Sequence, residues 1–235
     1  MDGLWKRLTH LKRYKNFSPR TIIDCGAYNG EWSKVAHNVF PNASMFMIEA
    51  NASKRNTLEK TNIPFQIGLL GDMNNVYTNY YMTHDEDDRG NSVYRERTKT
   101  FLDDNCSVTR LPMITLDKIV SDNNLKNVDL INFDLNGSEV DTIKGGEKIM
   151  KHVKYITIST QILEYNINAP KITDIILQLD KLGFKLYDII NINYLNDRQK
   201  LKELELIFEK EQDILDSIWD EELTTINILE MVSDL

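Results

Sequence analysis

Short runs rich in β-branched and aromatic residues alternate with segments of helical periodicity through most of this 235-residue chain. Such alternation is typical of parallel strands joined by crossover helices, because a parallel connection must return to the end of the sheet at which it started. Some runs, such as Met45 to Ile48, are apolar on both faces, as expected of strands covered by helices on each side. The sequence therefore predicts an α/β fold with a mostly parallel sheet.

The predicted elements follow one another in a regular order. We expect strands at residues 21–25, 44–49, 65–69, 128–134 and 155–160. We expect helices at residues 31–38, 53–62 (with Ser53 as N-cap), 138–152 and 171–182. The runs at 184–190 and 203–208 lie too close together for a helical crossover. They are predicted to form a C-terminal antiparallel hairpin at the sheet edge.

An insertion of about 55 residues, at about 73–127, separates the third predicted strand from the fourth. It contains two further β-rich runs, at 76–82 and 108–114, so we expect a β-containing insertion. Its middle, 84–104, is polar and mixed in charge. Loops of that length in compact domains are usually lids, binding loops or disordered segments.

The charge of the chain is unevenly distributed. The net charge is −8, from 28 basic and 36 acidic residues, which makes nucleic acid an unlikely partner. Residues 1–20 carry six Lys or Arg against one acid, and residues 209–235 carry nine acids against one Lys. We expect a basic N-terminal helical segment at 1–20 and an acidic C-terminal amphipathic helix at 209–235, which could dock on its own domain or on a second subunit of a homo-oligomer. Residues 21–208 form one mildly acidic domain, which suits a small polar acceptor.

The cysteines and apolar runs bear on location. Cys25 and Cys106 are too few for a disulfide framework, and no apolar run approaches the roughly 18 residues of a membrane span. We therefore expect a cytoplasmic protein. No metal site is predicted, since the acidic run at 85–88 lacks the ligand spacing of a calcium loop and is interpreted as a solvated face.

The first predicted strand ends in a glycine-containing turn, Asp24-Cys25-Gly26-Ala27-Tyr28-Asn29-Gly30. Gly26 permits a sharp turn, and Gly30 would let the backbone approach a ligand. The turn lacks the tight first pair of GxGxxG, so a pyrophosphate fits poorly. Asp24 could meet a cationic ligand group, and Glu49, which closes the second strand, could accept the hydroxyls of a ribose. This combination favours S-adenosylmethionine over NAD.

With these residues, the chain resembles the FkbM-like family of S-adenosylmethionine-dependent O-methyltransferases over about residues 21–208. The resemblance rests on an ordered set of blocks. These are the cofactor turn at 24–30, the "FEP/AN"-like block at 47–51, the third-strand turn at 68–72, the Ser-containing loop at 90–93, the "TLD"-like block at 114–117, and residues 129–139 with 143–146, which are similar to "DLLKIDVEGAE…LKGA".

The resemblance implies a class I methyltransferase (Rossmann-like) fold and S-adenosylmethionine as cofactor. The cofactor residues that its first two blocks imply are Asp24, Gly26, Ala27, Tyr28, Asn29, Gly30, Glu49, Ala50 and Asn51. It also implies that the acceptor is a hydroxyl, often on a sugar, glycan or polyketide. Two positions depart from the family pattern, because Asn132 replaces a lysine and Thr160 or Gln161 a glutamate. Asn132 and Ser92 are predicted to face the substrate.

Methylation of an alcohol requires a group that removes its proton. Asp134, at the end of the fourth predicted strand, would point into the crevice where open α/β sheets bind ligands. The alternative is that local backbone N–H groups neutralise it. His84, in the insertion, is a second candidate base if a lid brings it over the site, and otherwise a solvated loop residue. Glu139 is predicted to hold a substrate hydroxyl or to cap its helix.

Two other functions remain open at this point. An NAD(P)-dependent sugar dehydrogenase or epimerase would share the acid after the second strand. A catalytically inactive methyltransferase-like binding module would account for Asn132 and the missing glutamate. The favoured hypothesis is methyl transfer to a hydroxyl of a small polar acceptor, such as a sugar or glycan.

Overall fold

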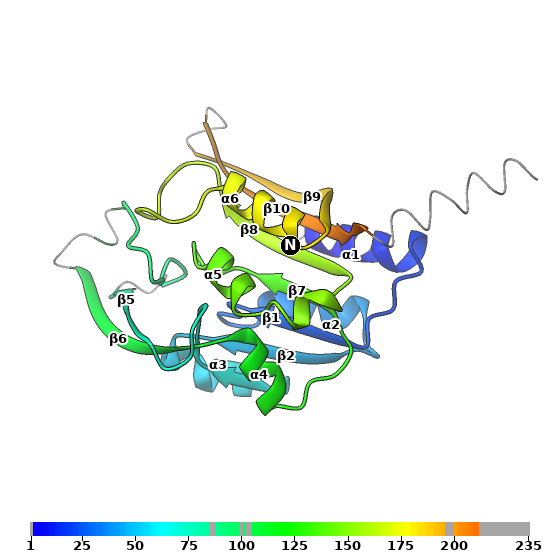
Figure 1. Ribbon diagram of the computed structural model, residues 1–235, viewed down its shortest axis with the longest axis horizontal. Coiled ribbons are helices and arrows are strands. Elements are labelled where there is room, and N and C mark those ends of the chain that lie inside the picture. The colour runs from blue at the N-terminus through cyan, green and yellow to red at the C-terminus, as the bar shows by residue number, and fades with distance from the viewer. Residues whose placement is uncertain (1, 85–87, 99–100, 102–104, 196–199, 212–235) are drawn as a thin grey trace, which may run out of the picture.

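The computed structural model describes residues 2–84, 88–98, 101, 105–195 and 200–211. Seven strands form one sheet in the order β3-β2-β1-β7-β8-β10-β9 (Figure 1). Their bounds are β1 Thr21–Cys25, β2 Ser44–Glu49, β3 Phe65–Ile67, β7 Val128–Phe133, β8 Tyr155–Gln161, β9 Phe184–Leu195 and β10 Lys200–Lys210. The neighbouring strands β3, β2, β1, β7 and β8 run parallel to one another. By contrast, β10 pairs antiparallel with both β8 and β9. The predicted mostly parallel sheet with a C-terminal antiparallel hairpin is confirmed.

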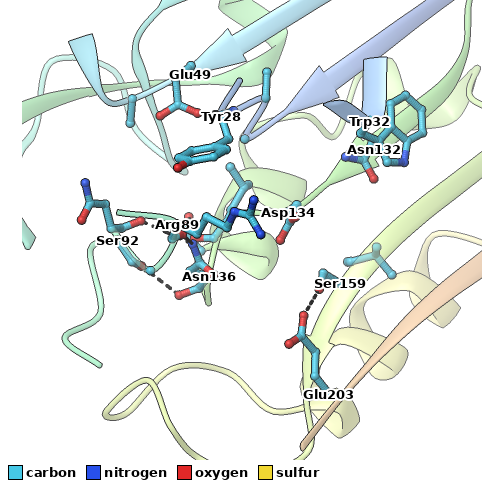
Figure 2. A pocket seen from close by; sticks show the side chains of 18 of the residues that line it. Tyr28, Trp32, Glu49, Arg89, Ser92, Asn132, Asp134, Asn136, Ser159 and Glu203 are labelled. Carbon is cyan, nitrogen blue, oxygen red and sulfur yellow. Dashed lines mark hydrogen bonds between the residues drawn. The ribbon is translucent and has the colours of Figure 1, made fainter. Parts of the chain in front are cut away.

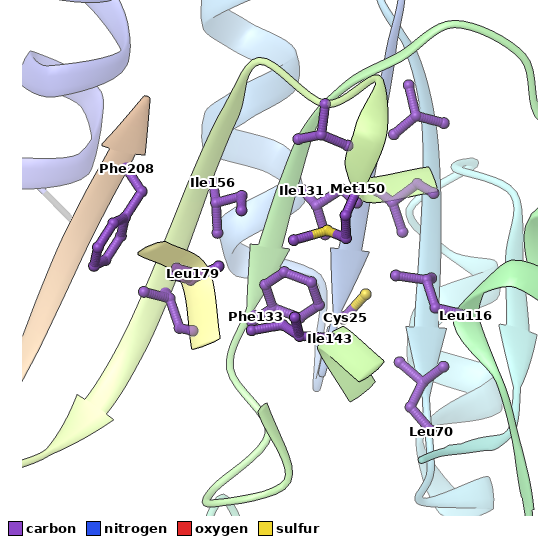
Figure 3. Close-up of a cluster of buried hydrophobic side chains, with 14 of the residues drawn as sticks. Cys25, Leu70, Leu116, Ile131, Phe133, Ile143, Met150, Ile156, Leu179 and Phe208 are labelled. Carbon is purple, nitrogen blue, oxygen red and sulfur yellow. The ribbon is translucent and has the colours of Figure 1, made fainter. Parts of the chain in front are cut away.

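Helices cover both faces of the sheet (Figure 1). They are α1 Asp2–Tyr14, α2 Glu31–Val39, α3 Arg55–Glu59, α4 Leu116–Asp122, α5 Glu139–Lys144 and α6 Ile172–Lys181, with short 3-10 turns at Ala52–Lys54 and Ile149–Lys151. Leu8 of α1 packs in one apolar cluster with Ile22. Ile143 of α5 packs in another with Ile23 and Cys25, and Figure 3 shows part of this second cluster. Neighbouring residues of β1 point to opposite faces, so this strand must be apolar on both.

The insertion forms a second sheet of three strands, in the order β4-β6-β5. Its strands are β4 Leu69–Leu70, β5 Tyr77–Thr83 and β6 Cys106–Ile114. The two strands predicted within the insertion are confirmed. The predicted strand at 65–69 is wrong in extent, because the chain passes from the main sheet to the second sheet at Gly68.

The helix predicted at 138–152 is interrupted after Lys144. Gly145 packs so closely on the chain that a Cβ atom there would lie 2.1 Å from the carbonyl oxygen of Gly71. After this contact only a 3-10 turn follows, at Ile149–Lys151. The close approach of two backbones, which periodicity does not reveal, therefore requires glycine at the position where the helix ends.

The helix predicted at 53–62 also differs in its start. The side chain of Asn51, not that of Ser53, caps the first turn, since the Asn51 Oδ1 accepts the backbone N–H of Ser53. The helix α4 was not predicted, and it begins at Thr115, whose side chain accepts the N–H of Lys118.

The N-terminal segment forms α1, whose Leu4, Leu8 and Leu11 are buried. Arg7 pairs with Asp188 of β9, and its Nε donates to the carbonyl of Ile189. Residues 212–235, which make up most of the predicted acidic helix, lie outside the described residues. Within the described part of the chain, none of the helices has the length and apolar content needed to cross a membrane.

We predict that Gly145→Ala lowers the free energy of unfolding by about 1–3 kcal/mol, because the added Cβ would overlap the Gly71 carbonyl. Urea unfolding of the purified protein measures this. Gly68→Ala is the matched control, since its Cβ would meet only side chains, a methyl of Ile114 at 3.3 Å and the Gln66 amide nitrogen at 3.8 Å. Equal stability of both variants would contradict the role given to this backbone contact.

Candidate functional site

A cavity of about 850 Å³ opens at the carboxyl ends of β1, β2, β7 and β8 (Figure 2). Between β1 and β7 the strand order reverses, and open α/β sheets bind ligands at such a switch point. The predicted site residues that line the cavity are Gly26, Ala27, Tyr28, Glu49, Ala50, Asn51, Ser92, Asn132 and Asp134. The predicted site residues that do not line it are Asp24, Asn29, Gly30, His84 and Glu139.

A row of buried polar side chains crosses the three central strands beside the cavity. In register, Asp24 of β1 pairs with Asn132 of β7, which pairs with Thr157 of β8. The Asn132 amide donates to Asp24 Oδ1 at 2.9 Å and accepts the Thr157 hydroxyl at 2.8 Å. Ser33 of α2 donates to the other Asp24 oxygen at 2.6 Å. We call Ser33, Asp24, Asn132 and Thr157 the polar row.

The polar row changes the role of Asp24. Both of its carboxylate oxygens are engaged by Ser33 and Asn132, and its side chain is fully buried. Burial raises the pKa of Asp24, and the two hydrogen bonds oppose that rise. The prediction that Asp24 meets a ligand directly is therefore corrected, because it holds Asn132, which does line the cavity.

The amide at position 132 suits the polar row. It donates to Asp24 and accepts from Thr157 at the same time. A lysine at this position could only donate, so it would leave the Thr157 hydroxyl without its present acceptor.

Glu49 organises the opposite end of the cavity. Its Oε2 accepts the backbone N–H of Tyr28 at 2.8 Å, and its Oε1 accepts that of Asn51 at 2.7 Å. Burial raises the pKa of Glu49 while these two hydrogen bonds lower it. An ionised carboxylate has about four acceptor sites, so each oxygen retains capacity for a ligand hydroxyl.

Glycine is required at two positions of the turn, 26 and 30, for different structural reasons. Gly26 has φ of 88°, and a Cβ there would lie 1.9 Å from the carbonyl oxygen of Asp134. Gly30 has φ of 78°, and a Cβ there would face Thr61 and Met47 within the protein. The prediction that Gly30 admits a ligand is thus corrected, because this glycine serves the turn and internal packing. Asn29 donates weakly to Glu31 at 3.4 Å.

Part of the insertion closes the end of the cavity at which Glu49 lies. Asp88, which lines it, pairs with Lys54 at 2.5 Å and accepts the Asn51 amide at 2.8 Å. The Lys54 Nζ also lies 4.0 Å from the centre of the Tyr28 ring. The interpretation of Asp88 as part of a solvated face is therefore wrong. Residues 85–87 lie outside the described part of the chain.

Ser92 connects the insertion to the loop that follows β7. Its hydroxyl donates to the carbonyl of Asn136 at 2.8 Å and accepts the Tyr94 N–H at 3.1 Å. The Asn136 amide returns a bond to the carbonyl of Arg89 at 2.6 Å. Ser92 is only 2% exposed, and its hydrogen bonds connect two loops that both line the cavity.

Asp134 opens into the cavity at the end of β7. In the described part of the chain, no hydrogen bond reaches its carboxylate, so the alternative of local backbone neutralisation is wrong. The Asp134 side chain is exposed towards the cavity, yet the protein around the cavity desolvates its carboxylate. This desolvation, together with the charges of Glu203 and Glu139, raises the pKa of Asp134. A carboxylate without partners and with a raised pKa has the properties of a general base.

The neighbouring acid, Glu139, is instead the one bound by backbone. Its Oε1 accepts the N–H groups of Leu135 at 3.0 Å and Gly137 at 3.2 Å. It lies against a side pocket that holds about one water, not in the main cavity. Desolvation raises its pKa to about 7, against the lowering effect of these bonds. The two predicted roles for Glu139 were to hold a substrate hydroxyl or to cap its helix. These contacts, with the loop just before α5, favour a structural role at the helix start over binding a substrate hydroxyl.

His84 is exposed and does not line the cavity. Its backbone N–H donates to the carbonyl of Asn105 across the base of the insertion. The geometry gives no support to the prediction of a base at this position.

The far wall of the cavity comes from β8 and β10, and the sequence pattern did not reveal it. The side chains that contribute to it are Thr157, Ser159, Lys202, Glu203 and Glu205. Glu203 accepts the Ser159 hydroxyl (Figure 2). The one available signal was the polar alternation of Glu203 and Glu205 in a strand, which by itself is typical of a solvated face.

The sequence matches the family described as Methyltransferase FkbM domain over residues 24–186, which is more than half of the chain. The chain belongs to this methyltransferase family. S-adenosylmethionine is its cofactor, and this excludes the nicotinamide alternative. A comparison with curated proteins found no match.

Solved structures of methyltransferases are similar to this chain at low sequence identity. An S-adenosylmethionine-dependent methyltransferase from Clostridium acetobutylicum is 8% identical, with a TM-score of 0.50, and the match covers 89% of this chain and 91% of that one. A precorrin-6y C5,15-methyltransferase from Geobacter metallireducens is 12% identical, with a TM-score of 0.47 and coverage of 87% and 86%. The first of these likenesses shows the fold alone.

The cavity fits the cofactor. The Glu49 carboxylate retains acceptor capacity for a ribose, and the Tyr28 ring and the 88–93 segment enclose the same end. The volume of about 850 Å³ lies in the range of ligand pockets, about 300–1,000 Å³.

We predict that Glu139→Gln becomes more stable relative to the wild type as the pH rises from 5 to 8. The folded pKa of about 7 exceeds the ordinary value of 4.5, so the wild type loses stability as Glu139 ionises through this window. The difference should change by about 1–3 kcal/mol. Urea unfolding at several pH values measures it. The exposed Glu147→Gln is the control, and a constant difference for Glu139→Gln would exclude the buried, protonated form.

Proposed function

We propose that this methyltransferase transfers a methyl group to a hydroxyl oxygen of a small polar acceptor, such as a sugar. The observation that carries the proposal is the Asp134 carboxylate, which opens into the cavity without a hydrogen-bond partner in the described chain. Oxygen acceptors need a base, because an alcohol is a poor nucleophile while it keeps its proton.

Asp134 acts as that base. It stands at the switch point, between the end that Glu49 organises and the wall made by β8 and β10. Bound S-adenosylmethionine supplies an electrophilic methyl group. The acceptor hydroxyl donates to Asp134, which withdraws the proton as the oxygen becomes the nucleophile. The polar row fixes Asn132 beside Asp134. Rigid walls that hold the acceptor in the reactive orientation contribute to the rate of methyl transfer.

The size and polarity of the cavity support a small polar acceptor. The 88–93 segment, tied down by Asp88 and Ser92, closes one side of it. The far wall presents the side chains of Thr157, Ser159 and Glu203, which are groups that bind hydroxyls.

We predict that Asp134→Asn lowers kcat by about 10²–10⁴-fold, because the amide cannot take a proton, while affinity for S-adenosylhomocysteine stays within error. The wild-type rate should rise with pH as Asp134 ionises, and the variant should lose this rise. Labelled-methyl transfer to a panel of sugars measures both. Asp122→Asn, exposed on α4, is the control. An unchanged rate in Asp134→Asn would remove this residue from the chemistry, and a cofactor-binding wild type that methylates no oxygen would favour an inactive binding module.

We predict that Glu49→Ala weakens binding of S-adenosylhomocysteine by about 10- to 100-fold, the loss expected for hydrogen bonds to a charged group. The variant removes a ribose acceptor and frees the N–H groups of Tyr28 and Asn51. Isothermal calorimetry measures the affinity. Glu59→Ala, exposed at the end of α3, is the control. Wild-type affinity in Glu49→Ala would show that the cofactor binds elsewhere.

A further inference from the structure

The acceptor wall of the cavity carries an excess of negative charge. Glu203 and Glu205 both lie on β10, two residues apart, so their side chains leave the same face of the strand. They line the cavity together with Asp134. Desolvation is the largest cause of the raised pKa values of Asp134 and Glu205. The charges of Glu203 and Glu205 add to the rise at Asp134, and the charge of Glu203 adds to the rise at Glu205.

Among the described residues, no Lys or Arg side chain forms an ion pair with this wall, and the charge of the chain's N-terminus lowers the pKa of Glu205 only against a larger rise from desolvation. The carboxylates of Glu203, Glu205 and Asp134 form no ion pair there. Lys202 lines the cavity, but its Nζ lies 4.5 Å from the centre of the Tyr165 ring. The Arg89 guanidinium lies over the Tyr28 ring. Glu203 accepts one neutral hydroxyl, from Ser159, and Glu205 accepts a neutral hydrogen bond from the Asn191 side chain.

The arrangement suits an organic cation better than a metal ion. Across the described chain, no three His, Cys, Asp or Glu side chains converge as metal ligands would, since these carboxylates are spread along a wall. An ammonium group donates three hydrogen bonds, and charge-assisted bonds to carboxylates are about twice as strong as neutral ones.

We propose that the acceptor carries a protonated amino group, bound by Glu203 and Glu205, a few bonds from the hydroxyl that faces Asp134. The acceptor class is then an amino sugar or a related amino alcohol. This inference rests on the proposed function, because it assigns the group next to the methylated hydroxyl. The Ser159 hydroxyl fixes Glu203 for this role (Figure 2).

The test compares probes that differ in one charge. With the protein saturated with S-adenosylhomocysteine, calorimetry measures the binding of D-glucosamine and of N-acetyl-D-glucosamine. We expect glucosamine to bind about tenfold more tightly or better. Equal binding, tighter binding of the acetylated sugar, or no binding of either would overturn the proposal.

Variants test whether the two glutamates cause the preference. Glu203→Gln keeps an acceptor for Ser159, and Glu205→Gln removes the second charge; each should lower the preference for glucosamine about tenfold. Glu147→Gln, exposed and outside the cavity, should keep it. Unchanged S-adenosylhomocysteine affinity confirms that the variants are folded. A loss of that affinity in Glu203→Gln would assign the charge to the cofactor, and a preference that persists in both variants would refute the assignment.

Product analysis separates this inference from the proposed function. Methylation on oxygen of neutral sugars but not of amino sugars would retain the proposed function and refute the amino-group assignment. Methylation of the amino nitrogen, with the binding preference intact, would refute oxygen transfer and retain the role of the two glutamates.

Discussion

The buried carboxylate of Asp24 must be hydrogen-bonded, and the centre of the structure is arranged to meet that need. A carboxylate without water is unstable unless donors surround it, and Asp24 receives one from α2 and one from β7. Asn132 continues the row to Thr157 of β8. These bonds hold the carboxyl ends of three parallel strands in one register, and the cavity opens where those strands end.

The same requirement separates the roles of the acids around the cavity. Asp24 and Glu139 have their oxygens engaged by protein donors, whereas Asp134 has no hydrogen-bond partner in the described chain. Glu49 is intermediate, since it holds two backbone N–H groups and retains acceptor capacity. Residues of one chemical type thus divide into the positioning role and the proposed cofactor and base roles according to which donors the fold brings near them.

The insertion completes the cavity through contacts with distant parts of the chain. Asp88 reaches Lys54 and Asn51, and Ser92 reaches Asn136. Because the Asp88 pair is largely shielded from solvent, it is less screened than a surface ion pair. The part of the insertion that closes the cofactor end of the cavity is therefore connected both to the residues that follow β2 and to the loop after β7.

Local patterns were sufficient for the α/β layout and for placing a glycine-containing turn after β1. The residues from Asp24 to Gly30 are contiguous in sequence, and a βα turn brings its own residues together. The acceptor wall, the break of the helix at Gly145 and the true role of Asp24 were not accessible in this way. They depend on partners far along the chain, such as Asn132, which lies 108 residues from Asp24, and on the register between strands. The sequence alone shows which residues are acidic. Burial and the hydrogen-bond donors on other strands, which only the tertiary structure brings together, determine which of those acids remains without a partner in the described chain.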